Sequence, residues 1–353
     1  MQLYIQDSSD KIGFSENQVT VWSEERGERG FPVETIEGIS IFGMPSLSSK
    51  FLRECLNHNI QLCFYSTDGH YFGRMVNSSS TSTSKQKLQA KRSDDDDFRL
   101  SIAKKIICAK ISNQEALLKA HDKDNQLSLK DFEGLEYGLT ALKDAKSVEE
   151  VMGLEGNAAR TYFTSLAKLV PGEWRFQGRS KRPPKDEFNA MISLGYSLLT
   201  RNIIGAIERH GLNPYFGFMH ADAEGHPTLA SDLIEEWRAI IVDDTVLEVI
   251  NSGKLNKDQF NHLDSGAVYV GYEGSKVLVR AISDKVCRAR SYLNYDHYKY
   301  GFQHALDLQI YRFTRAIESN DPDLYIPVSE LPESEIEVKE VYEEEKEKSD
   351  QEK

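Results

Sequence analysis

Short runs in which apolar and polar residues alternate fill the first part of the chain. Five runs are rich in β-branched and aromatic residues and are separated by Gly, Asp and Ser, as β-strands are: QLYIQD, QVTVWSE, TIEGISIFG, IQLCFYS and YFGRMV. One segment, LSSKFLRECLNHN, instead places its apolar residues at helical spacing. The pattern predicts an N-terminal β domain over residues 1–76 that contains one helix.

From Phe98 onward the apolar residues recur every three or four positions, which is typical of amphipathic helices. The segments with this pattern are FRLSIAKKIICAKISNQEALLKA, SVEEVMGLEGNAARTYFTSLAKLV, FNAMISLGYSLLTRNIIGAIERHG, TLASDLIEEWRAIIVDDTVLEVINSG and GSKVLVRAISDKVCRARSYL. Gly211 follows the third of them as a C-terminal cap. The expected fold class is α+β, with a β domain followed by a larger helical domain.

Two polar segments frame the helical part. Residues 77–97, NSSSTSTSKQKLQAKRSDDDD, are of low complexity and predict a flexible linker or loop, with the four Asp solvated in preference to binding a metal. Residues 328–353 are expected to form an acidic, disordered tail. In the simplest interpretation, this tail makes no contacts and only increases the solubility of the protein. Alternatives are a short helix that binds a partner and a segment that competes with an anionic ligand for basic groups of the same chain.

The formal net charge of −13 at first argues against a nucleic-acid partner. Residues 330–353 hold eleven Asp and Glu against four Lys, a net charge of −7, so the other 329 residues carry only −6. The average charge can therefore hide basic patches on the rest of the chain.

Cysteine spacing and hydropathy place the chain among intracellular proteins. The four cysteines have no CxxC spacing and are expected to be reduced thiols: Cys55, Cys63, Cys108 and Cys287. No apolar run reaches the roughly 18 residues that a membrane span needs, and the N-terminus has no signal-peptide core. We expect a cytoplasmic protein with no membrane partner.

Glu155 is a charged residue in the apolar stripe of a predicted helix. At helical spacing the stripe consists of Val151, Ala159, Tyr162, Phe163, Leu166 and Leu169. Burying an unpaired carboxylate costs several kcal/mol, by order of magnitude, so Glu155 needs a cation, a proton or a metal as partner. A structural ion pair and a functional site both satisfy this requirement.

His220, Asp232 and Glu235 supply further candidate metal ligands. His220 lies in a loop between predicted helices, where a lone histidine is usually structural. Asp232 and Glu235 share one helical face, which a solvated acidic surface also explains. Together with Glu155 they offer three carboxylates and one imidazole, a set that suits Mg²⁺ or Mn²⁺. Such an ion polarises phosphate oxygens and activates a hydroxyl nucleophile, although spacing does not establish that the four side chains converge.

A basic loop, WRFQGRSKRPPKDEFNA, lies between these candidates. Its cations are expected to bind DNA: Arg175, Arg179, Lys181, Arg182 and Lys185. Arginine forks suit phosphate oxygens, and the stiffness of Pro183 and Pro184 reduces the entropy lost on binding. Trp174 and Phe176 are expected to stack on bases. A solvated basic loop is the alternative.

The order of these motifs resembles the Cas-one family of CRISPR adaptation. The motifs that carry the resemblance include IEGISIFG, IAKKIICAKISNQ, GLEGNAARTYF, GRSKRPPKDEFNAMISLGYSLLT, GFMH and LASDLIEEWR. The resemblance covers residues 1–327 outside the Ser-rich segment, and the RPP and YIP features are most similar to the type I-C branch. It implies a small β-sandwich-like domain at 1–76 that forms a homodimer, a linker at 77–97, and an all-helical catalytic domain at 98–327.

The resemblance also implies the site residues. The family's catalytic metal ligands match Glu155, His220 and Glu235, and Asp232 matches a further acidic position near the metal, which is Mg²⁺ or Mn²⁺. Many relatives carry Asp where this chain has Glu235, so the division of roles between Asp232 and Glu235 stays open.

The implied function is metal-dependent DNA integration and cleavage. A DNA 3′-hydroxyl attacks a phosphodiester in the leader–repeat region, and short DNA fragments enter the CRISPR array. The implied partners are DNA (protospacer fragments and the CRISPR leader–repeat), a second copy of the chain, the Cas-two protein and a Cas-four nuclease. The alternatives are a catalytically inert DNA-binding scaffold, which needs no metal, and a metallohydrolase of small phosphoesters, which the basic loop disfavours.

Overall fold

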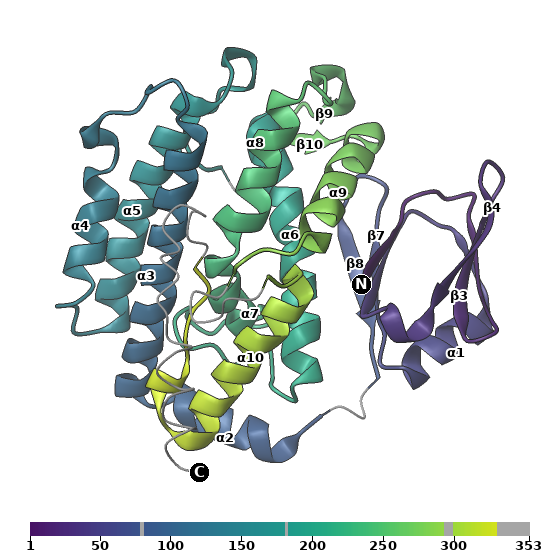
Figure 1. Cartoon of the computed structure of the whole chain (residues 1–353), viewed down its shortest axis with the longest axis horizontal. Coiled ribbons are helices and arrows are strands. Elements are labelled where there is room, and N and C mark those ends of the chain that lie inside the picture. Colours follow the sequence, from purple (N-terminus) through teal and green to yellow (C-terminus); the bar gives the residue numbers. More distant parts are fainter. Residues whose placement is uncertain (78–80, 181–182, 293–298, 330–353) are drawn as a thin grey trace, which may run out of the picture.

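A β region built from the first 75 residues lies beside a larger helical region (Figure 1). The computed structural model describes residues 1–77, 81–180, 183–292 and 299–329. The α+β class and the order of the two regions are as the sequence predicts.

Two four-stranded sheets and one helix form the β region. The first sheet has the order β1 (Gln2–Ile5), β5 (Gly38–Phe42), β7 (Gln61–Tyr65) and β8 (Tyr71–Met75). The second has the order β4 (Gly27–Pro32), β3 (Gln18–Ser23), β2 (Lys11–Ser15) and β6 (Ser46–Leu47), and helix α1 spans Ser49–Asn57. Side chains from both sheets and from α1 share one buried core, which includes Leu3, Ile12, Val19, Ile39 and Phe51.

Strands β2, β4 and β6 are not among the strands predicted from the sequence. Strand β4 is almost wholly exposed, so it has no buried apolar alternation to reveal it. Strands β2 and β3 are joined by Glu16 and Asn17, whose φ angles of 48° and 60° are those of a tight hairpin turn. Asn17 was the available sequence signal for this turn.

The helical region contains α2 to α10. Their bounds are α2 (Thr83–Ser93), α3 (Asp96–His121), α4 (Glu133–Ala141), α5 (Val148–Leu169), α6 (Glu187–Arg209), α7 (Thr228–Leu233), α8 (Asp244–Asn251), α9 (Tyr272–Cys287) and α10 (Phe302–Ser319). Helices α3, α4 and α5 pack together on one side, and α6 runs through the middle (Figure 1). The region is not all-helical, because β9 (Phe260–His262) and β10 (Val268–Val270) form a hairpin.

The prediction of a flexible linker over 77–97 is wrong for most of its length, because α2 and the start of α3 lie there; residues 78–80 fall outside the described part. Gln89 holds α2 in place, since its buried amide donates to the carbonyl oxygens of Asn213 and Phe216, both at 2.8 Å. Asp95 caps α3 by accepting the Phe98 N–H at 3.1 Å. Because these contacts are made by polar side chains, the segment shows no apolar periodicity from which the helices could be predicted.

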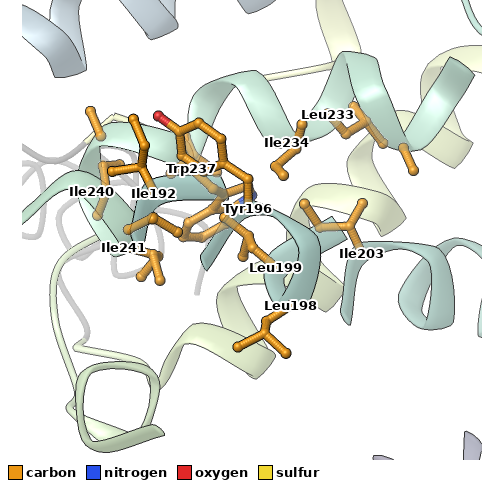
Figure 2. Packing of buried hydrophobic residues seen from close by; sticks show 14 of the residues in the cluster. Ile192, Tyr196, Leu198, Leu199, Ile203, Leu233, Ile234, Trp237, Ile240 and Ile241 are labelled. Carbon is orange, nitrogen blue, oxygen red and sulfur yellow. The ribbon is translucent and has the colours of Figure 1, made fainter. Parts of the chain in front are cut away.

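Helix α6 is the central core helix. Figure 2 shows Ile192, Tyr196, Leu199 and Ile203 of α6 packed against residues that include Trp237 and Ile241. By length and mean hydropathy (1.2) α6 is apolar enough to cross a membrane, a property that the residue pattern did not lead us to expect. Because 78% of that apolar window is buried inside the protein, its composition is explained by its place in the core. Gly211, with φ of 82°, ends the helix as predicted.

The β region is fixed to the helical region by polar contacts. Arg74 of β8 donates two hydrogen bonds of 2.6 Å to the Glu208 carboxylate of α6. The Tyr272 hydroxyl of α9 donates to the Gln6 carbonyl at 3.1 Å. The first contact attaches the first sheet to the central helix α6, and the second attaches the end of β1 to α9.

The cysteines are free thiols, as predicted. Cys55 and Cys63 are buried, while Cys108 and Cys287 are exposed. Burial raises the pKa of Cys55 to about 12 and that of Cys63 to about 11. The two buried thiols are therefore protonated and unreactive.

Candidate active site

The segment predicted as one helix from Thr228 to Asn251 is broken into four pieces. Between α7 and α8 lie a 3₁₀ turn, Ile234–Glu236, and a π-helical turn, Arg238–Asp243. Single π-helical turns within helices frequently occur at functional sites. The break buries three neighbouring acidic residues, because Asp232, Glu235 and Glu236 are 0%, 6% and 0% exposed. The interpretation of Asp232 and Glu235 as a solvated acidic surface is therefore wrong.

Asp232 holds His220 in one orientation. Its Oδ1 accepts the His220 backbone N–H at 3.0 Å and lies 2.7 Å from Nδ1 of the ring. Its Oδ2 accepts the N–H groups of Phe218 and Met219 at 2.6 and 3.1 Å. Since Nδ1 faces the carboxylate, Nε2 is the imidazole nitrogen left to bind another group.

The same carboxylate changes the proton affinity of the ring. Burial disfavours the charged imidazole, but the hydrogen bond and negative charge of Asp232 outweigh it, so the pKa of His220 is raised. The charge of Glu235 acts in the same direction, which places Glu235 within electrostatic reach of His220. Asp232 itself has both oxygens occupied, and this favours an orienting role for it over a direct metal contact.

Glu155 and Glu235 meet at the ammonium group of Lys110. Glu155 comes from α5, Glu235 from the 3₁₀ turn and Lys110 from α3 (Figure 1). The Lys110 Nζ contacts Glu155 and lies 2.6 Å from Oε2 of Glu235. Arg238 pairs with Oε1 of Glu235 at 3.1 Å. The partner that Glu155 needs is thus a cation, one of the three that the sequence allowed.

The two cations determine the protonation state of Glu235. Burial opposes ionisation, but Arg238 and Lys110 outweigh it and lower the pKa of Glu235 to about 2. Conversely, burial disfavours the charged form of Lys110, but Glu235 and Glu155 outweigh it and raise its pKa. The cluster therefore combines two acidic and two basic side chains. Lys110 and Glu235 are buried, whereas the side chains of Glu155 and Arg238 are 19% and 24% exposed.

The donors of this cluster are of the type that Mg²⁺ and Mn²⁺ bind. Glu155 and Glu235 present carboxylate oxygens toward one point, and His220 offers Nε2 within electrostatic reach. Among the described residues, nothing donates a well-aligned hydrogen bond to the buried Oε2 of Glu235. In the described part of the chain, no three His, Cys, Asp or Glu side chains stand close enough to hold an ion without rearrangement. The donor atoms of Glu155, Glu235 and His220 are therefore of the right chemical type for Mg²⁺ or Mn²⁺. The Lys110 ammonium lies where the two carboxylates converge.

Lys110 and Arg238 were missed by the sequence analysis. Lys110 follows Ile106 by four residues on the buried side of α3 and is 7% exposed. It is a charge inside an apolar stripe, the same signal that identified Glu155. Arg238 stacks its guanidinium 4.4 Å from the centre of the Tyr196 ring. The Tyr196 hydroxyl in turn donates to Asp243 at 2.6 Å. This hydrogen bond fixes the ring against which Arg238 packs.

A second buried acidic residue lies next to the cluster. Glu236 accepts hydrogen bonds from the Val328 N–H at 2.6 Å, from the Gln309 amide at 2.8 Å and from the Tyr325 hydroxyl. Asn113, three residues after Lys110 on α3, donates to the Val328 carbonyl at 3.1 Å. Val328 is fully buried, so the predicted tail boundary at residue 328 is too early; residues 330–353 lie outside the described part.

The basic loop contributes differently from what its sequence predicts. Arg179 is partly buried and donates to Asn189 and Ser193 at 3.0 and 3.1 Å, which holds the loop on α6. Arg175 and Lys185 are exposed, and Lys181 and Arg182 lie outside the described residues. Two exposed cations are therefore available to an anionic partner, and Arg179 is engaged in structure.

The expectation that Trp174 and Phe176 stack on bases is wrong. They are only 4% and 5% exposed. Phe176 stacks on Phe188 of α6 with ring centres 4.1 Å apart, and Trp174 packs against Phe260 of β9. Both aromatic side chains anchor the loop to the core.

Comparison with known proteins identifies the family. The family model described as CRISPR associated protein Cas1 matches residues 3–284. The chain belongs to the Cas1 family. A CRISPR-associated endonuclease Cas1 from Mycobacterium tuberculosis is 44% identical over 329 residues, which cover 93% of this chain and 97% of that protein. The family resemblance inferred from the motifs is confirmed.

Solved structures share the fold of this Cas1 chain. A casposase bound to integration product has a TM-score of 0.81 and 26% identity, with 99% of each chain covered. A Cas6-RT-Cas1–Cas2 complex has a TM-score of 0.77 and 22% identity over 94% of this chain and 36% of that one, which shows the fold alone. The similarity to the Cas1 endonuclease and to the casposase thus covers both regions of the chain.

Proposed function

We propose that this Cas1 protein is a metal-dependent DNA integrase and endonuclease of CRISPR adaptation. The observation that carries the proposal is the convergence of Glu155 and Glu235, from separate segments, on the Lys110 ammonium. His220, held by Asp232, lies within electrostatic reach of Glu235. The Cas1 endonuclease and the casposase bound to integration product, to which the chain is similar, support the same chemistry.

Glu155, Glu235 and Nε2 of His220 would hold Mg²⁺ or Mn²⁺. When bound, such an ion polarises the phosphodiester and favours ionisation of the attacking hydroxyl. Asp232 orients the imidazole through Nδ1, and Arg238 neutralises part of the charge on Glu235. Because Asp232 is saturated with hydrogen bonds, we assign it the orienting role and Glu235 the ligand role.

The proposed substrate is DNA. In the integration step a 3′-oxygen bonds to a backbone phosphorus in the leader–repeat region, and the existing phosphodiester bond at that phosphorus breaks, so the number of phosphodiesters is conserved. Arg175 and Lys185 lie exposed on the basic loop and are suited to hold phosphates without reading sequence. The burial of Trp174 and Phe176, the aromatic side chains on which bases were expected to stack, favours backbone contacts by the basic loop over stacking.

The proposed assembly includes a second copy of the chain and the Cas2 protein. The Cas6-RT-Cas1–Cas2 complex, which shares this fold, supports the second partner. The β region exposes large apolar side chains, Met44 at 87% and Phe72 at 64%, which are suited to a protein interface. A Cas4 partner and membership of the type I-C branch remain predictions.

Strand transfer in the presence of Mn²⁺ tests the function. Purified protein would be incubated with a short duplex bearing free 3′-hydroxyls and a target containing a leader–repeat sequence. Glu155→Ala, His220→Ala and Glu235→Ala should each lower product formation by at least about a hundredfold, the scale on which a general catalytic group acts. EDTA should have the same effect on the unchanged protein.

Glu149→Ala is the matched control, because it removes an exposed carboxylate from the same helix as Glu155. Glu155→Ala should stay folded, since Lys110 keeps Glu235 as a partner. Near-normal transfer by the three site variants would contradict the assignment. DNA binding without metal-dependent transfer in the unchanged protein would instead support the inert scaffold.

A further inference from the structure

Lys110 occupies the point at which the two proposed metal-binding carboxylates meet. Its ammonium contacts Glu155 and lies 2.6 Å from Oε2 of Glu235, and the whole residue is 7% exposed. The side chain reaches this point from α3, whereas the carboxylates come from α5 and from the 3₁₀ turn. Lys110 therefore joins three separate segments of the chain through charge.

The charges of this cluster are balanced without a metal. Glu155 and Glu235 contribute two negative charges, and Lys110 and Arg238 contribute two positive charges. A divalent ion at the same carboxylates would bring two more positive charges within a few ångströms of an ammonium group. Repulsion between like charges is strong where water is excluded. Repulsion between the ion and the buried ammonium of Lys110 therefore favours the departure of one of the two resident cations when a divalent ion binds.

The surroundings of the two cations indicate which one leaves. Arg238 is packed 4.4 Å over the Tyr196 ring and pairs with Oε1 of Glu235. Lys110 is held by the two carboxylates at the end of a flexible four-carbon stem. It also faces Oε2, the oxygen to which no described residue donates a well-aligned hydrogen bond. Lys110 blocks the position that a metal needs, and Arg238 does not.

We propose that Lys110 is a built-in counter-cation that occupies the metal position of the ion-free protein and is displaced when Mg²⁺ or Mn²⁺ binds. The inference rests on the proposed function, because it takes Glu155 and Glu235 as metal ligands. Lys110 is then a positioning residue: it prevents repulsion between the carboxylates before the ion arrives, and it lowers the affinity for the ion by competing with it.

Direct measurement of Mn²⁺ binding tests this competition. The electron paramagnetic resonance signal of free Mn²⁺ would be followed during titration of the full chain and of Lys110→Met, which keeps an unbranched side chain one atom shorter than lysine and removes its charge. We expect Lys110→Met to bind Mn²⁺ about tenfold more tightly, a typical strength of coupling between two binding events. Mn²⁺ should also raise the melting temperature of Lys110→Met more than that of the unchanged protein.

Lys285→Met is the matched control. Lys285 is likewise buried, at 1% exposure, and is ion-paired with Asp244 on another part of the helical region. Its replacement should lower stability in the same way and leave the Mn²⁺ affinity unchanged. This comparison separates competition for the metal from the general effect of removing a buried ammonium.

A second measurement uses the unchanged protein and does not depend on the folding of a variant. Reductive dimethylation of each lysine, read by mass spectrometry, should modify Lys110 slowly without metal and several times faster with Mn²⁺, while Lys285 stays protected. Equal Mn²⁺ affinity in Lys110→Met, or a Lys110 that stays protected with Mn²⁺ bound, would overturn this inference alone. Failure of the unchanged protein to bind Mn²⁺ would overturn the proposed metal use and this inference with it.

Discussion

The pKa values of the adjacent residues Glu235 and Glu236 are shifted in opposite directions because the two carboxyl groups have different neighbours. Glu235 faces Lys110 and Arg238, and its pKa is lowered to about 2. Glu236 points the other way, to the hydrogen-bond donors of the C-terminal segment. Burial raises the pKa of Glu236 to about 8, because its hydrogen bonds only partly offset the loss of water. The Glu235 carboxylate is thus ionised and able to bind a cation. The Glu236 carboxyl stays protonated and holds the C-terminal segment at Val328 through hydrogen bonds.

The protonation of Glu236 makes stability depend on pH. Its folded pKa of about 8 lies above the ordinary value of 4.5, so the folded protein retains a proton that the unfolded chain releases. This stabilisation is complete below about pH 4.5 and is lost as the pH rises to about 8. At about 1.4 kcal/mol per pKa unit the full change is about 5 kcal/mol.

Urea unfolding of the unchanged protein and of Glu236→Gln checks this prediction. The free energy of unfolding of Glu236→Gln, relative to that of the unchanged protein, should increase by several kcal/mol between about pH 5 and pH 8. Glu149→Gln, a change at an exposed carboxylate, should show no such increase. A difference that stays constant with pH would show that Glu236 is ionised in the folded protein.

Single residues could be predicted where a charge interrupts an apolar stripe. Glu155 was found in this way, and the rest of its stripe is buried at Val151, Tyr162 and Leu166. The same signal is present at Lys110. The sequence could not show that the two residues are partners, because ion pairing between helices depends on how the helices pack.

At the scale of elements, apolar spacing located α3, α5 and α6 but did not reveal the break between α7 and α8. The 3₁₀ turn and the π turn are only three and six residues long, so neither is long enough to change the apolar periodicity of the segment visibly. Helix α2 and strand β4 were missed for the opposite reason. Their stability comes from polar contacts and strand pairing, which leave no apolar pattern.

The basic loop provides a prediction at this scale. Replacing Arg175 and Lys185 with Ala should weaken binding to any duplex about equally, because both cations are exposed and suited to phosphate contacts. The slope of log affinity against log salt should become shallower by about 0.9 for each DNA phosphate that the variant no longer neutralises. Fluorescence anisotropy over a salt series measures this slope.

Arg179→Ala serves as the comparison for that experiment. Because Arg179 donates to Asn189 and Ser193, its removal should lower the melting temperature, whereas the Arg175 and Lys185 changes should not. An unchanged salt slope in the double variant would mean that the loop does not touch the DNA backbone.

At the scale of the whole molecule, the order of the two regions could be predicted, but their attachment could not. The change from strand spacing to helical spacing is visible along the chain. The Arg74–Glu208 contact joins residues 134 positions apart, and neither side chain is distinctive in its own segment. The end of the chain was also misplaced, because the burial of Val328 depends on contacts with Glu236 and Asn113.

That anchored end, at Val328, lies next to the candidate site. Val328 bonds to the immediate neighbour of Glu235, and 24 residues of net charge −7 follow Ser329 in the sequence. If this segment competes with DNA for the basic surface, a chain that ends at Ser329 should bind non-specific DNA more tightly than the full chain, with the larger gain at low salt, where screening is weakest. Affinities at about 50 and 300 mM salt bracket this range. Coincident low-salt curves would leave a solubility role for the segment.

The central claim is that Glu155, His220 and Glu235 hold one divalent ion, and locating that ion tests it most directly. Crystals of the full chain grown with Mn²⁺ would be measured at the manganese absorption edge. We predict one strong anomalous peak within bonding distance of Glu155, Glu235 and Nε2 of His220, with Lys110 moved away. A peak elsewhere, or Lys110 still between the two carboxylates with no peak beside it, would contradict the claim.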